Sequence, residues 1–490
     1  MVALTACGGG GGGSYSAPTP PPASAPTVSF AQPGTGTAII LGQAVTVVWQ
    51  SANATSCTAT ASSAAAGAFT GSQGLAGGMP IAPTAAGSYT YSVSCTGAGG
   101  TTSASSASVT VKPNILSTLA PTGTIPTVGS TIDPVNGDQN PYGLTIATAT
   151  AGLITQGDLI VCNFNNAGTT ANAGGVQGTG TTIIGLHPGT GSVPYRIAQS
   201  ADLLGCNALA TLSDGSIAAA SWASNMNPLV SATGAVGTPF SDAFAAPWGE
   251  AYVPAKTVGT SDHLPAALYI SNAPGSTAIA AGGTLDRISF EGDAQTPFVE
   301  IATGFCTSGA PGGIYGPAGL TYDPASDTLY IVDTSSASVI AIAGVSSLTQ
   351  DGVVVNGQCT ATSFPTPVPT FSGPQADHVT IIAHGAPLST PLSATLLQDG
   401  DLLVANADIG VNAPSSATNL LIEISPVLPG GFVGNPLQVD NGTPGALFGL
   451  AATVDANGNQ IVYFNDDNAS AVMQLSAAPP ASTTPPATGY

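Results

Sequence analysis

The chain has 490 residues and a formal net charge of −21, from 4 Lys+Arg against 25 Asp+Glu, yet only 6% of its residues are charged. Nucleic-acid binding and polybasic attachment to a membrane surface both need a basic patch, and 4 scattered cations cannot form one. With 63 Gly, 40 Pro and 43% hydrophobic residues, the composition indicates a turn-rich globular chain with room for about two to four domains.

Residues 1–26 combine a short motif with the composition of a linker. Leu4-Thr5-Ala6-Cys7 precedes a run of glycines and a Ser/Ala/Pro-rich stretch that ends near Pro26. The motif resembles the lipobox of bacterial lipoproteins, which implies cleavage before Cys7 and acylation of its thiol. A signal peptide needs a basic region and roughly 7–15 apolar residues, so the residues before Cys7 would be only the end of one. The remainder of the segment is predicted to be a tether, because Gly- and Pro-rich chains are flexible to semi-extended.

No later segment reaches the roughly 18 consecutive apolar residues of a membrane span, so the lipid on Cys7 would be the only membrane anchor.

Residues 27–112 alternate apolar and polar side chains, as in Val45, Val47 and Trp49. This period of two is typical of half-buried antiparallel strands and predicts a β-sandwich. The runs VVWQSANATSCTAT and GSYTYSVSCTGAGG resemble a bacterial immunoglobulin-like domain of cell-surface proteins. The resemblance implies a disulfide between Cys57 and Cys95. It departs from the antibody pattern because Trp49 precedes the first cysteine.

Residues 113–477 repeat a unit of two strands joined by a turn, usually followed by a third strand. The clearest copies begin at Gly319, Ser393 and Gly449, with GLTYDPASDTLYIVD as the example. Aligning the second strands places one residue of each of six units in register: Asn163, Ser221, Asn272, Asp333, Asn406 and Asn465. Strand units repeated with this spacing predict a six-bladed β-propeller, because each unit can bury its faces only against its neighbours. The Gly-Leu strand, the Asp-x-x-Gly turn and the strand ending in Asn or Asp resemble NHL-repeat propellers.

Four cysteines fall within these repeats and allow three connectivities. Pairing each with its nearest neighbour joins Cys162 to Cys206 and Cys306 to Cys359, and this is the preferred hypothesis. The absence of any Cys-x-x-Cys pair in the sequence argues against a zinc finger or a thioredoxin-like redox site. The Pro/Thr-rich tail at 478–490 is predicted to be disordered.

The register residues have two interpretations. Blade symmetry would bring such side chains around a common axis, where carboxylates and amides bind Ca²⁺. The favoured interpretation is structural, because Asn and Asp at strand ends cap the backbone of the following turn. The run from Asp455 to Asn459 also resembles the start of a calcium loop, but Gln460 stands where an EF-hand loop needs glycine, so a hairpin turn is expected.

No sequence motif for nucleophilic or zinc-dependent hydrolysis is present. The chain has neither His-Glu-x-x-His nor Gly-x-Ser-x-Gly. His378 and His384 lie near Asp377 in the sequence. In one interpretation the histidines supply a catalytic base that the Asp377 carboxylate orients. In the favoured interpretation they are exposed turn residues. Tyr142 and the Trp222 and Trp248 indoles are expected to pack in the fold, with stacking on a sugar or peptide as the alternative.

These observations favour an all-β, exported, lipid-anchored cell-envelope protein without nucleic-acid partners. Its expected role is non-enzymatic binding or scaffolding, with a protein or glycan ligand at the propeller's loop face, which a rigid ring presents well. No cofactor is expected, with Ca²⁺ as the exception described above. The alternative is a metal-dependent, lactonase-like hydrolase or lyase with its site on the propeller axis. A cluster of three or more carboxylates or histidines on that axis would favour the enzyme, and an apolar axis would contradict it.

The scarcity of Lys and Arg has a consequence for stability. Most carboxylates cannot be in salt bridges, so little stability should depend on their ionisation, and the fold is expected to survive acid.

Overall fold

The structure, a computed structural model, describes residues 21–121, 123–237, 244–258, 262–275, 278–291, 294–309, 315–360, 364–407 and 418–477. The predicted lipidation residue Cys7, most of the predicted tether and the tail at 478–490 lie outside these residues. The chain divides into two compact units, Met1–Pro113 and Asn114–Tyr490. No helix among the described residues has the length and apolar character needed to cross a membrane.

The first unit consists of short strands in three sheets. One sheet has the order β1-β3-β6, from β1 (Thr27–Gln32), β3 (Val45–Ala52) and β6 (Ala76–Ile81). A second has the order β2-β10-β7, from β2 (Ala38–Ile40), β10 (Val109–Lys112) and β7 (Gly87–Tyr89). The third has the order β5-β4-β8-β9, from β5 (Gly71–Gln73), β4 (Ser56–Ala61), β8 (Tyr91–Gly97) and β9 (Gly100–Ser105).

The alternating sequence pattern produces one shared core in this unit. Val45, Val47 and Trp49 of β3 are buried, whereas Thr46 between them is exposed and Val48 is half-buried, as the period of two predicts. Phe69 lies edge-on to both Trp49 and Tyr91, with ring centroids 5.6 and 5.5 Å apart. Residues of all three sheets join this cluster, so the strands pack as a sandwich.

The disulfide of the first unit differs from that of antibody domains. Cys57 and Cys95 are bonded and lie directly opposite each other on the paired strands β4 and β8. In antibody domains the corresponding bond joins the two sheets. Here it joins neighbouring strands of one sheet, so the immunoglobulin-like assignment stays a prediction.

The second unit is a six-bladed β-propeller, and the predicted all-β propeller class is confirmed. Blade 1 is β12 (Gln139–Ile146), β13 (Leu159–Asn165), β14 (Thr182–Leu186) and β15 (Tyr195–Gln199). Blade 2 is β16 (Cys206–Thr211), β17 (Ile217–Ser221) and β18 (Leu229–Val230). Blade 3 is β19 (Pro247–Val253), β22 (Ala266–Asn272), β23 (Ala280–Glu291) and β25 (Val299–Thr307).

Blade 4 is β26 (Pro317–Asp323), β27 (Thr328–Asp333), β28 (Ser338–Ala343) and β31 (Val379–His384). Blade 5 is β32 (Pro391–Leu396), β33 (Leu402–Asn406), β34 (Leu420–Ile424) and β35 (Phe432–Gln438). Blade 6 is β36 (Leu447–Val454), β37 (Gln460–Asp466), β38 (Ala471–Ser476) and β11 (Thr127–Ser130).

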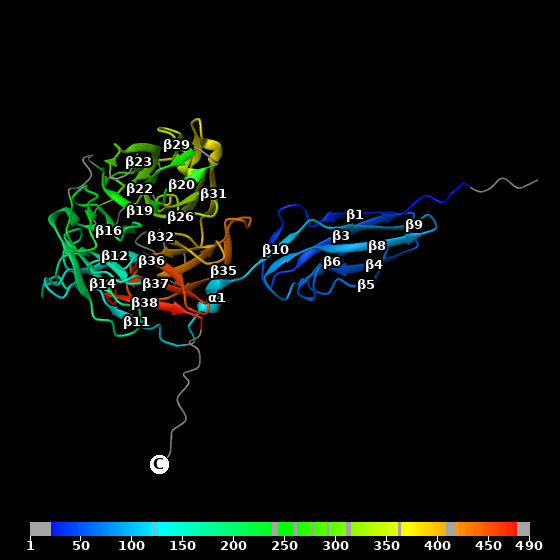
Figure 1. The fold of residues 1–490 in the computed structure, drawn as a ribbon, viewed down its shortest axis with the longest axis horizontal. Helices are drawn as coiled ribbons and strands as arrows, with labels where there is room; N and C mark the ends of the chain where they lie inside the picture. The colour runs from blue at the N-terminus through cyan, green and yellow to red at the C-terminus, as the bar shows by residue number, and fades with distance from the viewer. Residues whose placement is uncertain are drawn as a thin grey trace, which may run out of the picture. The chain divides into compact units, whose positions relative to one another are not determined.

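The first strand of each blade is the innermost one. These inner strands contact one another in a closed cycle, β12 to β16, β19, β26, β32, β36 and back to β12. Figure 1 shows them gathered at the centre of the ring, with the outer strands at its rim. β11 closes the ring, because this early strand is the outer strand of blade 6 and pairs with β38.

Short insertions extend the ring. β29 (Val353–Asn356) and β30 (Thr370–Ser372) lie in sequence between β28 and β31 of blade 4 but extend the sheet of blade 3. Blade 3 also carries the hairpin of β20 (Lys256–Val258) and β21 (Asp262–Leu264), and β24 (Ala294–Gln295). The helix α1 (Ile115–Leu119) begins after Asn114, whose side chain accepts a hydrogen bond from the Ser117 N–H.

The propeller contains two disulfides, with the connectivity that the sequence analysis preferred. Cys162 of blade 1 is bonded to Cys206 of blade 2. Cys306 of β25 is bonded to Cys359, which follows β29. The first bond joins adjacent blades, and the second fastens the inserted strands to blade 3.

Candidate functional site

The centre of the propeller is built by a repeating pattern along its inner strands. Side chains two residues apart form successive layers, since alternate residues of a strand share a face. The first layer is Tyr142, Asn207, Trp248, Ala318, Leu392 and Phe448. The second layer is Leu144, Leu209, Glu250, Leu320, Ala394 and Leu450. The third layer is Ile146, Thr211, Tyr252, Tyr322, Leu396 and Ala452.

Between the first two layers, each inner strand has a small residue, and this explains the Gly-Leu motif. A Cβ on Gly449 would lie 2.6 Å from the Tyr142 carbonyl oxygen, and one on Gly319 would lie 2.6 Å from the Cα of Ser393. Both neighbours are backbone atoms of the next blade. Glycine is therefore required for the close approach of adjacent inner strands, and leucine fills the centre.

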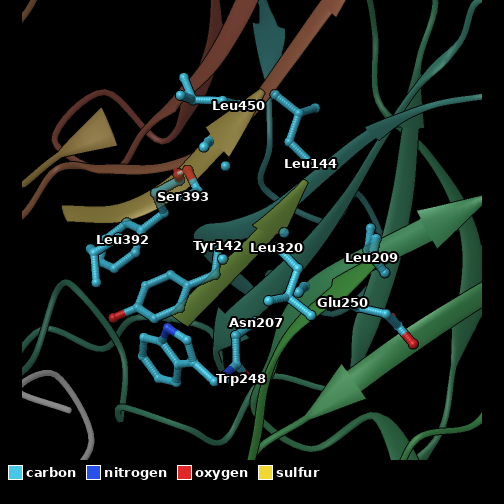
Figure 2. A pocket seen from close by; sticks show the side chains of 16 residues that line it. Tyr142, Leu144, Asn207, Leu209, Trp248, Glu250, Leu320, Leu392, Ser393 and Leu450 are labelled. Carbon is cyan, nitrogen blue, oxygen red and sulfur yellow. Dashed lines mark hydrogen bonds between the residues drawn. The ribbon is translucent and has the colours of Figure 1, made fainter. Parts of the chain in front are cut away.

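Aromatic side chains close the channel at the first layer. The Tyr142 ring stacks between Phe448 and Phe164, with centroids 3.6 and 4.1 Å apart, and meets Trp248 edge-on at 6.2 Å. Tyr142 and Trp248 are buried, and Trp222 packs at the border of this cluster. These residues pack against one another, as the sequence analysis expected. Below them, the space between the first two layers is only about 80 Å³ (Figure 2).

The opposite end of the channel opens to the surface. A cavity of about 320 Å³, here called the mouth, lies at the ends of the inner strands. Apolar side chains of the second layer line it, together with the hydroxyl groups of five threonines and two tyrosines. These are Thr145, Thr148, Thr211, Thr321, Thr395, Tyr252 and Tyr322. Glu250 is the one ionisable carboxyl among the described residues that line it, and no Lys or Arg does.

Glu250 occupies a position where four blades have leucine and one has alanine. Its side chain is buried, and its Oε1 accepts a hydrogen bond of 2.7 Å from the Asn227 amide of blade 2, whereas Oε2 has no partner. Burial raises the pKa of Glu250 to about 8, against the opposing effects of the Asn227 side chain and the Ala220 N–H. Figure 2 shows its carboxyl group directed away from Tyr142 and Trp248. The sequence analysis missed this residue, although the missing leucine of blade 3 was a visible signal.

The channel does not fit a metal on the propeller axis. Ca²⁺ takes about 6–8 oxygen ligands, and catalytic zinc takes about three protein ligands. The described lining supplies one carboxyl group, that of Glu250, with neutral hydroxyl and amide groups but no second carboxyl group and no histidine.

The register residues lie on the second strands and are all buried. In blades 2 to 5 the register residue lies opposite the first residue of the inner strand, and in blade 1 it lies opposite the third, Pro141. In all five blades the pairing register shifts directly after this position. Such a bulge leaves backbone groups unpaired. Asn406 accepts hydrogen bonds from the Ser389 and Thr390 N–H groups, and Asn465 donates to the carbonyl of Tyr142 in the next blade. Asn406 and Asn465 thus replace missing backbone partners, whereas Asn163 and Asn272 donate to side-chain oxygens of the third strand of their own blade.

Asp455 forms the expected hairpin turn. Its Oδ1 accepts hydrogen bonds of 2.8 Å from both the Asn457 and Asn459 N–H groups. These bonds hold the pKa of the exposed Asp455 below its ordinary value, the Asn459 side chain contributing most. The Asp455 carboxylate thus accepts hydrogen bonds from the backbone of its own turn.

The histidines named from the sequence are not brought together with a carboxylate. His378 Nδ1 lies 2.8 Å from the Ala343 carbonyl oxygen, and His384 ends the edge strand β31 with an exposed side chain. The sequence analysis missed His187, whose Nδ1 lies 2.7 Å from the buried Asp158. Asp158 also accepts a hydrogen bond from the Tyr195 hydroxyl. Asp158 directly precedes β13, His187 directly follows β14 and Tyr195 begins β15, so spacing in the sequence gave no signal.

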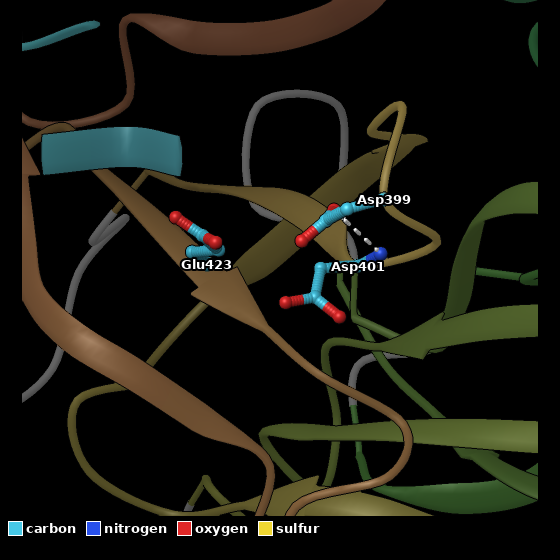
Figure 3. Close-up of side chains that lie close together, drawn as sticks. All are labelled: Asp399, Asp401 and Glu423. Carbon is cyan, nitrogen blue, oxygen red and sulfur yellow. Dashed lines mark hydrogen bonds between the residues drawn. The ribbon is translucent and has the colours of Figure 1, made fainter. Parts of the chain in front are cut away.

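Three carboxyl groups of blade 5 lie within 4.8 Å of one another: Asp399, Asp401 and Glu423 (Figure 3). Both oxygens of Glu423 accept hydrogen bonds from α1, at 3.1 Å from the Ile115 N–H and 2.5 Å from the Leu116 N–H. Burial, with Asp401 and Asp399 nearby, raises the pKa of Glu423 to about 7. The contact with α1 accounts for this cluster as a structural one.

Comparisons with known proteins find only remote similarities to solved structures. No protein-family model and no curated protein matches the chain. A gluconolactonase from Xanthomonas campestris matches at 12% identity over 73% of this chain and 96% of its own, with a TM-score of 0.42. A virginiamycin B lyase from Staphylococcus aureus matches at 15% identity over 70% of this chain and 83% of its own, with a TM-score of 0.37. A Bacteroides thetaiotaomicron protein of unknown function matches at 11% identity over 93% of this chain and 99% of its own, with a TM-score of 0.40.

Proposed function

We propose that this protein is an exported, lipid-anchored envelope protein whose propeller is a binding module. The lipobox-like residues before Cys7 and the glycine-rich tether support the anchor. The three disulfides support export, because such bonds persist in oxidising compartments. In this proposal residues 27–112 are an immunoglobulin-like spacer, the blades are NHL-like, and the location is the outer membrane or cell surface.

The mouth is the observation that carries the binding function. It is an open cavity with hydroxyl groups around an apolar floor, which is the composition of a ligand site and not of a packed core. The described residues around it offer no nucleophile paired with a base. A protein or glycan of the cell envelope that places a small group in the mouth is the ligand that this geometry supports best.

The test blocks the mouth without disturbing the ring. Ala452 lines the mouth at the layer where blades 3 and 4 carry tyrosine, so Ala452→Tyr introduces a side chain that the ring already accommodates twice. Ala201, exposed on the connection between blades 1 and 2 at the opposite face, is the control position. We expect the full chain to bind purified envelope fractions and a glycan array, Ala201→Tyr to bind equally, and Ala452→Tyr to lose at least tenfold in affinity. Equal binding by both variants would overturn the proposal.

A second candidate is a lactonase-like hydrolase or lyase, and Glu250 is the observation that favours it. A buried carboxyl group with a pKa near 8 holds a proton at neutral pH, as a general acid must. The channel lining supplies no further acidic group or histidine among the described residues. Hydrolysis of glucono-lactone by the full chain, dependent on an added divalent metal and abolished in Glu250→Gln, would establish the enzyme and replace the binding proposal.

A further inference from the structure

We propose that the mouth binds a small organic ammonium ion, with the carboxylate of Glu250 as its counter-ion. This inference rests on the proposed function, because it names the ligand chemistry of the same site. It follows from a buried group without a partner, from the aromatic and hydroxyl lining, and from the charge of the surrounding face.

Glu250 places a carboxyl group in the buried layer where four blades have leucine. Its Oε2 is buried without a hydrogen-bond partner, a situation that costs about 1–3 kcal/mol. Leucine at the same layer in four other blades shows that the ring needs no carboxyl group there. An ammonium group has N–H donors and no acceptor, so it would supply what Oε2 lacks.

The lining of the mouth also suits a cation. Tyr252 and Tyr322 present aromatic rings, whose faces attract ammonium ions, and the threonine hydroxyls can accept N–H hydrogen bonds. An anionic ligand would find no Lys or Arg among the described lining residues. A neutral sugar would use the hydroxyls but would give no reason for a buried carboxyl group.

The face around the mouth carries a ring of aspartates. In each blade the turn after the inner strand lies on this face, because the inner strands all end there. Four of these turns contain an aspartate that accepts a hydrogen bond from its own turn: Asp214, Asp323, Asp399 and Asp455. The one Lys or Arg of the six turns is Lys256, whose Nζ lies 3.8 Å from Asp327. Such a ring attracts cations and raises their association rate, an effect that salt weakens.

Binding of an ammonium ion would displace the proton of Glu250. The strands packed against β19 are β16, β17, β22 and β26, and they bring only Tyr269, Tyr322 and Asp323 as titratable groups, beside Tyr252 on β19 itself. Because burial keeps the Glu250 carboxyl group protonated at pH 6.5, formation of the carboxylate–ammonium pair releases one proton to the solvent.

The experiment is calorimetric titration of the full chain at pH 6.5 with n-pentylamine and with pentan-1-ol, its uncharged isostere. Titrations in two buffers of different ionisation enthalpy count the released protons. We expect the amine to bind at least tenfold more tightly than the alcohol, to release about one proton, and to lose at least tenfold in affinity in Glu250→Leu and Glu250→Gln. Equal binding of amine and alcohol, or unchanged amine binding in either variant, would overturn the inference.

Two controls separate the possible failures. Glu250→Leu removes the buried carboxyl group together with the acceptor of the Asn227 amide, whereas Glu250→Gln keeps the shape of the side chain and an acceptor oxygen, and a thermal melt of each variant verifies that it is folded. If Ala452→Tyr abolishes envelope binding while the amine shows no preference, the binding function stands and the ammonium inference fails. If the amine binds through Glu250 while Ala452→Tyr leaves envelope binding intact, the ammonium site stands and the proposed function fails.

Discussion

One small residue in each inner strand sets the distance between neighbouring blades. Glycine occupies this position in four blades, and Ala208 and Ser393 occupy it in the other two. The propeller thus depends on residues that contribute almost no buried area of their own. Their role is to allow backbone atoms of adjacent blades to meet.

Gly449→Ala tests this at a single residue. The added Cβ would lie 2.6 Å from both the Tyr142 carbonyl oxygen and the Leu144 Cβ, so the backbone of blade 1 must move. We expect a loss of roughly 1–3 kcal/mol in the free energy of unfolding, as for other overpacked cores. Urea denaturation followed by circular dichroism measures it. Gly123→Ala, whose added Cβ would meet nothing within 4 Å, is the control, and equal stability of the two variants would contradict the argument.

The contact of α1 with blade 5 depends on one side chain. Glu423 accepts the first free N–H groups of a helix too short to be stable alone. Glu423→Ala leaves both donors without this acceptor, and a buried unsatisfied group costs about 1–3 kcal/mol.

We therefore expect Glu423→Ala to increase amide hydrogen exchange at residues 115–119 and to lower the unfolding midpoint of the propeller. Glu423→Gln, which keeps one acceptor oxygen, should show a smaller effect. Asp377→Ala, at an exposed position, should show none. An unchanged exchange rate in Glu423→Ala would show that apolar packing alone holds the helix.

The elements that sequence reasoning found are those with local signals. Turn residues and alternating hydrophobicity predicted the blades because each hairpin is contiguous in the chain. The membership of β11 in blade 6, the addition of β29 to blade 3 and the contact of α1 with Glu423 are pairings between distant segments, for which no local pattern exists. At the site, the polar register residues were visible as a repeat, whereas Glu250 matters because it departs from one.

Across the whole propeller, buried carboxyl groups outnumber buried ion pairs among the described residues. Burial raises the pKa of Glu250 to about 8, of Asp286 and Glu423 to about 7, and of Asp466 to about 6. A raised pKa in the folded state means that folding favours the protonated form. The stability that these groups contribute is fully present below pH 4, near their pKa values in the unfolded chain, and is lost as the pH rises toward 8.

The pKa of Asp133 is shifted in the opposite direction, below its ordinary value. Burial alone would raise its pKa, but the hydrogen bonds from Arg196 and from the Asn136 and Val135 N–H groups hold it below the ordinary value. Its contribution is present above the unfolded pKa and disappears as the pH falls through the folded one. Protonation of Asp133 therefore lowers the free energy of unfolding only in strong acid.

We expect the unfolding midpoint of the full chain in urea to be higher at pH 5 than at pH 8. The expected difference is on the order of a few kcal/mol in the free energy of unfolding, since one pKa unit corresponds to about 1.4 kcal/mol. Circular dichroism at fixed ionic strength measures it. A midpoint that rises from pH 5 to pH 8, or unfolding above about pH 4, would contradict both this prediction and the expected acid resistance.

The pairing of β11 with β38 also determines when the molecule can be completed. Ser130 and Ser470, joined by a hydrogen bond at this seam, lie 340 residues apart in the chain. Blade 6 lacks its outer strand until both ends of the propeller sequence are present, so a ribosome must synthesise residues 127–476 before the ring can form. Truncated products would retain an open blade edge and exposed apolar faces, which proteases of the cell can recognise. The closing strand therefore makes the folded ring a test that the whole propeller sequence has been synthesised.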